Sequence, residues 1–117
     1  MLSLPPLVRV FLATQPTDMR RSFDGLCALV QNQLDQDPFS GHLFVFLNRR
    51  RDRVKLLYWC GDGFAIWYRR LEKGTFQTPS AAGDQMRLEM KASELSLILD
   101  GIDLTSVRRR PRYQRPA

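Results

Sequence analysis

Hydrophobic residues recur along this chain with two different spacings, and each change of spacing predicts a new element. From Ser22 onward the apolar positions have helical offsets, which predicts a first helix with one core-facing stripe. The helix is expected to end near Gln36, because Pro38 disfavours helical geometry at the residue before it. Ser22 is a candidate N-cap, and Asp18 could cap an earlier start. The stripe comprises Phe23, Leu26, Cys27, Val30 and Leu34.

Four further segments have the composition of strands. Residues 8–12 are bounded by prolines and are expected to form an edge or peripheral strand. Residues 43–47 and 54–60 are apolar runs joined by a short charged connection, which predicts an antiparallel hairpin at the centre of the sheet. Residues 86–90 alternate apolar and charged side chains, as a half-exposed strand does.

The segment after Gly61-Asp62-Gly63 is expected to be helical. Its apolar residues have offsets of 0, 3, 4 and 7, a spacing that favours a short amphipathic helix over another strand, with Gly74 as a left-handed C-cap. A last helix should begin near Ser93 and end at Gly101. The residues with helical offsets in the first of these helices are Phe64, Trp67, Tyr68 and Leu71, and the inward residues of the second are Leu95, Ile98 and Leu99.

These elements predict an α+β fold. We expect a single small domain over residues 1–107, built from a mainly antiparallel sheet with a central hairpin (about 43–60) and two to three packed helices. A length of 117 residues with 44% hydrophobic content suits one such domain. No apolar run approaches the roughly 18 residues of a membrane span, and the N-terminus lacks a basic leader, so the protein is expected to be cytoplasmic.

The two cysteines are expected to be small core residues in a reducing compartment. Cys27 lies on the predicted helical stripe and Cys60 ends a predicted strand. Neither belongs to a Cys-x-x-Cys pair, and His42 is the only histidine, so the sequence offers no zinc-ligand set and no cofactor is expected.

The net charge of +6 is concentrated in a few places. Five arginines lie in the last ten residues, and without them 13 basic residues stand against 12 acidic ones. Residues 108–117, rich in arginine and proline, are predicted to be a disordered tail. Local basicity of this kind favours a polyanionic partner. The candidate nucleic-acid-binding residues are Arg49, Arg50, Arg51, Arg53, Lys55, Arg69, Arg70, Lys73, Arg108, Arg109, Arg110 and Arg112.

Each basic cluster also has a simpler interpretation. The hairpin arginines have the planar, bidentate geometry that suits phosphate, so the hairpin could track a nucleic-acid backbone. They could instead form a solvated turn that keeps the sheet soluble. The tail could be an electrostatic arm or a solubilising end. Aromatic residues near the cations could stack on bases. Trp59 and Trp67 are expected in the core, so Tyr58 or Tyr68 is the better candidate for such a contact at the surface.

The carboxylates do not form a recognisable catalytic set. No pair has a spacing that by itself brings two carboxylates to one metal ion, and their surroundings are those of helix starts and turns. The sequence also lacks a phosphate loop and a nucleophile elbow, so we do not expect an enzyme. The carboxylates considered are Asp18, Asp24, Asp52, Asp62 and Glu72.

Three stretches resemble a known family. They are Thr17-Asp18-Met19-Arg20-Arg21-Ser22-Phe23-Asp24-Gly25-Leu26, the block from Asp37 to Phe76, and Leu99-Asp100-Gly101-Ile102-Asp103. The chain resembles the small TnpB-type accessory protein of insertion-sequence family sixty-six, a group of bacterial mobile elements. The resemblance implies a protein encoded beside the transposase and required for efficient movement, while the large companion protein supplies the acid triad that cuts and joins DNA.

Two functions are compatible with these patterns. The first is a non-catalytic accessory protein for transposition that contacts DNA, at element ends or target, through its basic patches and assists the transposase. The second is an interaction module that docks on the transposase or self-associates, with DNA contact incidental. Aromatic and arginine side chains are the usual anchors of protein interfaces, so the interface candidates are Phe64, Tyr68 and Arg69.

Overall fold

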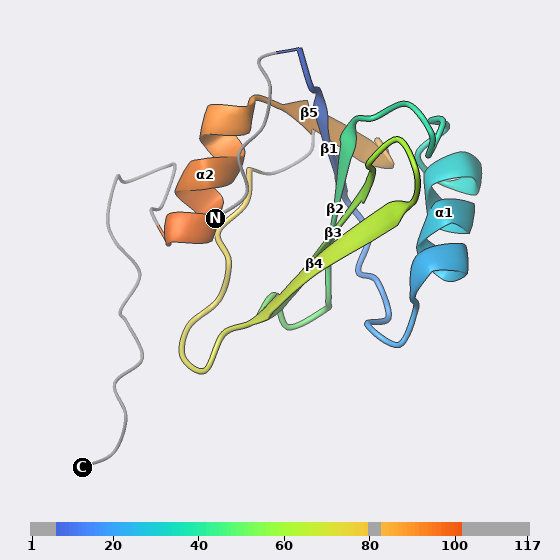
Figure 1. Ribbon diagram of the computed structural model, residues 1–117. Helices are drawn as coiled ribbons and strands as arrows, with labels where there is room; N and C mark the ends of the chain where they lie inside the picture. The colour runs from blue at the N-terminus through green and yellow to red at the C-terminus, as the bar shows by residue number, and fades with distance from the viewer. Residues whose placement is uncertain (1–6, 80–82, 102–117) are drawn as a thin grey trace.

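The computed structural model describes residues 7–79 and 83–101. These residues form one five-stranded sheet, in the strand order β4-β3-β2-β1-β5, and two helices (Figure 1). Only β1 and β2 are parallel, so the predicted α+β fold with a mainly antiparallel sheet is confirmed. In chain order the elements are β1 (Val10–Ala13), α1 (Phe23–Asn32), β2 (Leu43–Leu47), β3 (Arg53–Trp59), β4 (Phe64–Arg70), β5 (Arg87–Met90) and α2 (Ala92–Asp100).

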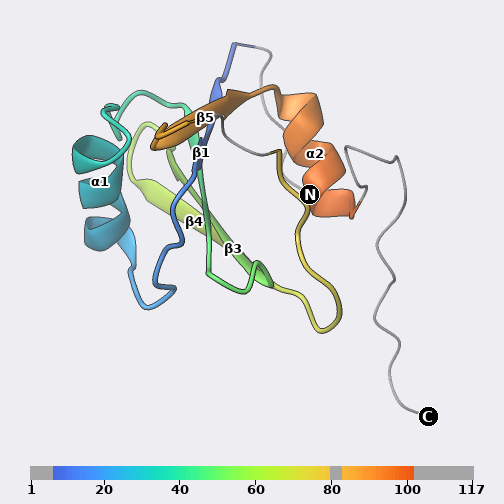
Figure 2. The same cartoon turned by 180° about the vertical axis from the view of Figure 1, so that it is seen from behind.

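The two helices cover opposite faces of the sheet, which divides the apolar side chains into two cores (Figures 1 and 2). Successive strand residues point to opposite faces, so β2 sends Val45 toward α2 and Phe44 and Phe46 toward α1. This explains the lack of polar alternation in β2. The predicted central hairpin is confirmed, since β2 and β3 pair antiparallel inside the sheet. Within the described ranges, neither helix has the length and apolar content that a membrane span requires.

The prediction of an edge position for the first strand is wrong. β1 lies between β2, its parallel neighbour, and β5, its antiparallel neighbour. All four of its residues are buried. The prolines that suggested an edge precede and follow β1 rather than interrupt it, so no hydrogen bond of the ladder is lost.

The predicted helix after Gly63 is also wrong, because residues 64–70 form β4, which pairs antiparallel with β3. The helix was predicted because apolar side chains of this strand point to both faces of the sheet. Phe64 and Ile66 pack on the α1 side, whereas Trp67 and Leu71 pack on the α2 side. A strand covered on both faces imitates helical spacing over so short a segment, while its aromatic and β-branched content favours a strand.

The turn before β4 closes a second hairpin. Cys60 N–H donates to the Gly63 carbonyl at 2.8 Å, and Gly61 has a φ of 97°, a conformation that glycine adopts without strain. Gly74 is left-handed too (φ 81°), but it follows a strand and caps no helix.

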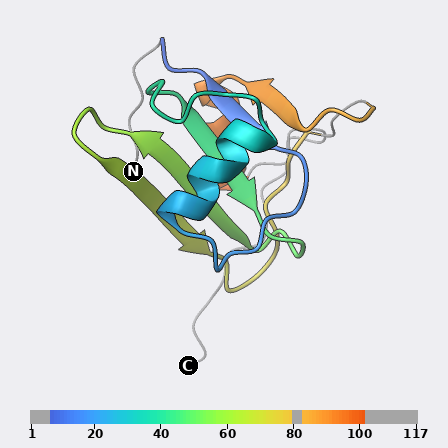
Figure 3. The same ribbon diagram turned by 90° about the vertical axis from the view of Figure 1, so that its right-hand side faces the viewer.

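The two helices agree with the sequence in part. α1 ends at Asn32, before the predicted Gln36, and the Ser22 side chain makes no capping hydrogen bond. Phe23 is 44% exposed, so it does not belong to the buried stripe. Figure 3 shows α1 lying across the strands on its side of the sheet.

β5 and α2 confirm the predicted strand and last helix, with Gly101 in the left-handed region (φ 80°) and Leu95, Ile98 and Leu99 buried. The arginine tail at 108–117 lies outside the described residues.

Candidate nucleic-acid interface

The connection between β2 and β3, residues 48–52, is held by one asparagine. The Asn48 Oδ1 atom accepts hydrogen bonds from the backbone N–H groups of Asp52 (3.1 Å) and Arg53 (3.0 Å), and its Nδ2 donates to the Asp52 carboxylate at 2.6 Å. The turn places Arg51 in the left-handed region, with a φ of 59°. The arginine-rich tip therefore has a defined shape, which lowers the entropic cost of binding through it.

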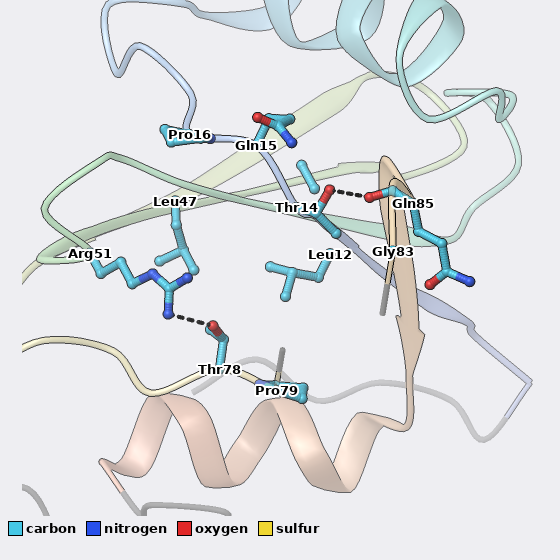
Figure 4. A pocket seen from close by; sticks show the side chains of 11 residues that line it. Leu12, Thr14, Gln15, Pro16, Leu47, Arg51, Thr78, Pro79, Gly83 and Gln85 are labelled. Atoms are coloured by element: carbon cyan, nitrogen blue, oxygen red, sulfur yellow. Dashed lines mark hydrogen bonds between the residues drawn. The ribbon is translucent and has the colours of Figure 1, made fainter. Parts of the chain in front are cut away.

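The tip is also tied to the segment that follows β4. The backbone N–H of Leu71 donates to the Asp52 carbonyl and that of Phe76 to the Arg51 carbonyl, both at 2.7 Å. The Arg51 guanidinium turns toward the same segment and donates to Thr78 Oγ1 at 3.1 Å, across a pocket of about 270 Å³ (Figure 4). Arg51 is thus partly committed to holding the fold together.

Arg49 and Arg50 differ from Arg51. Both are exposed, and neither makes a hydrogen bond or ion pair with any residue that the structure describes. Together with Arg53 they line an open groove of about 510 Å³ beside the segment that leads into α1. The Arg49 and Arg50 guanidiniums keep their donors available to an external anion, whereas Arg53 Nη1 donates to the Tyr68 hydroxyl at 3.4 Å.

Two carboxylates on this groove already have partners. The Arg20 guanidinium and backbone N–H donate to Asp18 and lower the pKa of its carboxyl to about 2. The hydrogen bond from the Asn48 amide likewise lowers the pKa of the Asp52 carboxyl. Asp18 is neutralised by Arg20, so the groove keeps more positive than negative charge.

Lys55 does not lie on the basic surface. It is only 8% exposed, beneath the start of α1, and its Nζ donates to the carbonyls of Met19 and Arg21, both at 2.8 Å. The ammonium also lies 4.9 Å from the centre of the Tyr68 ring. Lys55 therefore fastens the segment before α1 to the sheet. Its ammonium is not part of the candidate interface.

The second basic cluster, Arg69, Arg70 and Lys73, also contains both structural and surface cations. The Arg69 guanidinium donates to the Leu99 carbonyl at 3.0 Å, near the C-terminus of α2, and stacks 4.7 Å from the centre of the Trp67 ring. Arg70 forms an ion pair with Glu72 at 2.9 Å. Lys73 is exposed. Arg69 thus joins the sheet to α2, while the other two cations stay at the surface.

Strand register brings the two clusters together. Arg53 in β3 lies directly opposite Arg70 in β4, and the β2–β3 connection and segment 71–79 lie at the same end of the sheet (Figure 1). We call this surface the basic end; it comprises Arg49, Arg50, Arg53, Arg70 and Lys73. The candidates Arg108, Arg109, Arg110 and Arg112 lie outside the described residues.

An aromatic cluster lies at the other end of β3 and β4. The rings of Phe39, Trp59 and Phe64 contact one another, with centroid separations of 4.9–5.0 Å. Phe39 is 55% exposed, and Tyr68, further along β4, is 47% exposed. Phe39 was missed by the sequence analysis, since it follows Pro38 in a connection without periodic spacing; its exposure depends on tertiary structure alone.

The cysteines and carboxylates add no site of their own. Cys60 is exposed, contrary to expectation, because β3 ends one residue before it. Cys27 is half-buried. The pKa of its thiol is raised, mainly by burial and to a smaller extent by the nearby negative charge of Asp24. Within the part of the chain that the structure describes, no group of three His, Cys, Asp or Glu side chains could hold a metal ion.

The fold and the basic end define a small α+β protein with free guanidiniums on a rigid hairpin tip. A family model described as IS66 Orf2 like protein matches residues 8–109, so the chain belongs to this family and has an accessory role in transposition. This confirms the resemblance seen in the sequence.

Two relatives from Sinorhizobium fredii are similar over most of their length. One, the uncharacterized protein y4jC, is 41% identical over 104 residues, which cover 89% of this chain and 87% of the relative. The other, the uncharacterized protein y4hO, is 40% identical over 96 residues, or 82% of each chain. No solved structure matches the chain.

Proposed function

We propose that this accessory protein is non-catalytic and binds the phosphate backbone of DNA through the basic end. The observation that carries the proposal is the pair Arg49 and Arg50, exposed and without a hydrogen bond or ion pair among the described residues, on a tip that Asn48 holds in place. A phosphate backbone offers the bidentate acceptors that free guanidiniums fit.

The arrangement favours backbone contact over the reading of base sequence. The basic end combines arginines from a turn and from two neighbouring strands, whereas the described aromatic side chains pack mainly against the sheet or one another. Guanidiniums on phosphates release counterions, which supplies affinity without sequence preference. The proposed role is therefore to hold DNA, at element ends or target, for the companion transposase.

Replacing Arg49 and Arg50 together by glutamine is expected to weaken DNA binding about 10- to 30-fold at low salt, if each phosphate contact contributes about 1 kcal/mol. The loss of two contacts should also make the dependence of log affinity on log salt shallower by about 2. Fluorescence anisotropy with labelled duplex and single-stranded DNA across a salt series measures both effects.

The matched control removes the same charge elsewhere. Arg9 is paired with Glu89, and Lys91 is exposed just before α2, so an Arg9→Gln, Lys91→Gln protein should bind almost as the unmodified chain does. Equal weakening in both proteins would show a nonspecific charge effect and overturn the assignment. In a chain truncated after Val107, the Arg49, Arg50 variant should still bind DNA more weakly than the control variant. If the two truncated variants bound DNA equally, the binding site would lie in the tail and not at the basic end.

Docking on the transposase is a second candidate function, which the exposed Phe39 ring favours. Large aromatic side chains at the surface are frequent anchors of protein interfaces. If this cluster contacts the transposase, Phe39→Ser should reduce co-purification of the two proteins at least tenfold, whereas Phe23→Ser, at another exposed phenylalanine, should leave it unchanged. Equal effects of both changes would reject this surface.

A further inference from the structure

The outer edge of β4 is open. β4 is the terminal strand of the sheet on its side, has seven residues and contains no proline. Among the described residues, no backbone hydrogen bond outside the sheet reaches residues 64–70. A long, regular edge strand with unpaired N–H and C=O groups is a template for pairing with another strand.

Two hydrogen bonds show which β4 residues point outward. Gly63 accepts from Cys60, and Leu71 donates to Asp52, so both bond toward the β3 side of the hairpin. In an antiparallel ladder, alternate residues bond to the same neighbour. Residues 65, 67 and 69 therefore bond to β3. The N–H and C=O groups of residues 64, 66, 68 and 70 point away from the sheet.

We propose that a second copy of this chain pairs with this edge, β4 against β4 in antiparallel orientation. The two-fold axis passes near Trp67, so Phe64 faces the partner's Arg70 and Ile66 faces the partner's Tyr68. All four outward residues on each strand then find partners, which gives about eight backbone hydrogen bonds in one continuous sheet.

Charge selects this orientation. The turn before β4 carries Asp62, and the other end of the strand carries Arg69 and Arg70. In the antiparallel register about Trp67, Asp62 lies opposite the partner's Glu72, a carboxylate already paired with Arg70, and Arg70 itself is the diagonal neighbour of Asp62. A parallel pair in register would instead place the same arginines of the two copies side by side. The antiparallel pair also brings the partner's Arg70 next to the Phe39, Trp59 and Phe64 rings, a favourable cation–π arrangement.

The dimer has a geometric consequence that rests on the proposed DNA contact, although the pairing itself does not. The two basic ends would lie at diagonally opposite corners of the joined sheet, roughly 30 Å apart from strand spacing and rise. This distance approaches one turn of duplex DNA, about 34–36 Å. One dimer could therefore contact the backbone at two places on one face of a duplex.

Disulfide trapping tests the register. Residue 65 should lie opposite the partner's residue 69 as a non-hydrogen-bonded pair, with Cα atoms about 4.5 Å apart, within the range that a disulfide spans. Ala65→Cys and Arg69→Cys are made in separate proteins that also carry Cys60→Ser, since Cys60 is exposed. Circular dichroism verifies that each variant folds.

The mixed sample should form a cross-linked heterodimer under mild oxidation. Each variant alone should not, because its own two cysteines would lie about 13 Å apart in the dimer. Equal cross-linking in the separate samples, or none in the mixture, would overturn the proposed pairing.

Sedimentation velocity supplies a test without cysteines. Ala65→Lys introduces a cation beside the partner's Arg69 twice per dimer, and should raise the dissociation constant at least tenfold. Gln31→Lys, on the exposed face of α1, adds the same charge away from the edge and should have no effect. A purely monomeric unmodified chain at about 100 µM, or equal behaviour of both variants, would reject the dimer. Neither result bears on DNA binding by the basic end.

Discussion

Replacing Phe44 by alanine is expected to lower the free energy of unfolding by about 3–5 kcal/mol. Phe44 has no exposed surface, and its ring stacks on that of Phe11 with a centroid separation of 5.8 Å and an interplanar angle of 17°. It lies in the central strand and fills the core beneath α1, where the rigid sheet cannot collapse onto the cavity. Urea unfolding followed by circular dichroism measures the change.

Phe39→Ala is the matched control for this prediction. The same atoms are removed, but the residue is 55% exposed and its ring packs against those of Trp59 and Phe64. Its loss should cost about 1 kcal/mol. If both changes destabilised the protein equally, the division into a packed α1 core and an exposed aromatic cluster would be wrong.

Replacing Lys55 by methionine is expected to cost about 2–4 kcal/mol, because hydrogen bonds to a charged group contribute about 1.5–3 kcal/mol and two carbonyls would lose their donor. Methionine retains most of the apolar stem, so the change isolates the ammonium from its packing. The lost bonds are those to Met19 and Arg21, which hold the approach to α1 against the sheet.

Lys73→Met provides the comparison, since this lysine is exposed after β4 and its replacement should change stability by no more than about 0.5 kcal/mol. Folded Lys55→Met protein should also bind DNA as the unmodified chain does, because the ammonium does not reach the basic end. Unaltered stability together with weakened DNA binding would restore Lys55 to the interface.

The arginine cluster illustrates how far sequence patterns predict this site. Its position at a hairpin tip follows from two apolar runs with a charged connection between them. The sequence does not predict which of these arginines bond within the fold and which remain free. Arg51 turns to Thr78, while Arg49 and Arg50 stay free, because the Asn48 network and a left-handed residue orient successive side chains differently.

The β4 strand shows the opposite outcome. Its spacing of apolar residues satisfies helix and strand periodicities together, so local pattern could not separate them. Seven cross-strand partners on β3 decide the matter, since strand pairing supplies hydrogen bonds that an isolated helix of eight residues cannot match. The candidate dimer edge exists only because of that pairing.

The sequence by itself determined the family, the α+β class, the central hairpin, the last helix and the arginines at the tip. These features depend on local spacing, turn residues and recognisable strings, all of which neighbours in the chain specify. The tertiary structure alone decided that β1 lies inside the sheet, that β4 is a strand, that Lys55 is buried and that Phe39 is exposed. Each of these depends on contacts between residues far apart in the sequence, and a linear pattern does not record them.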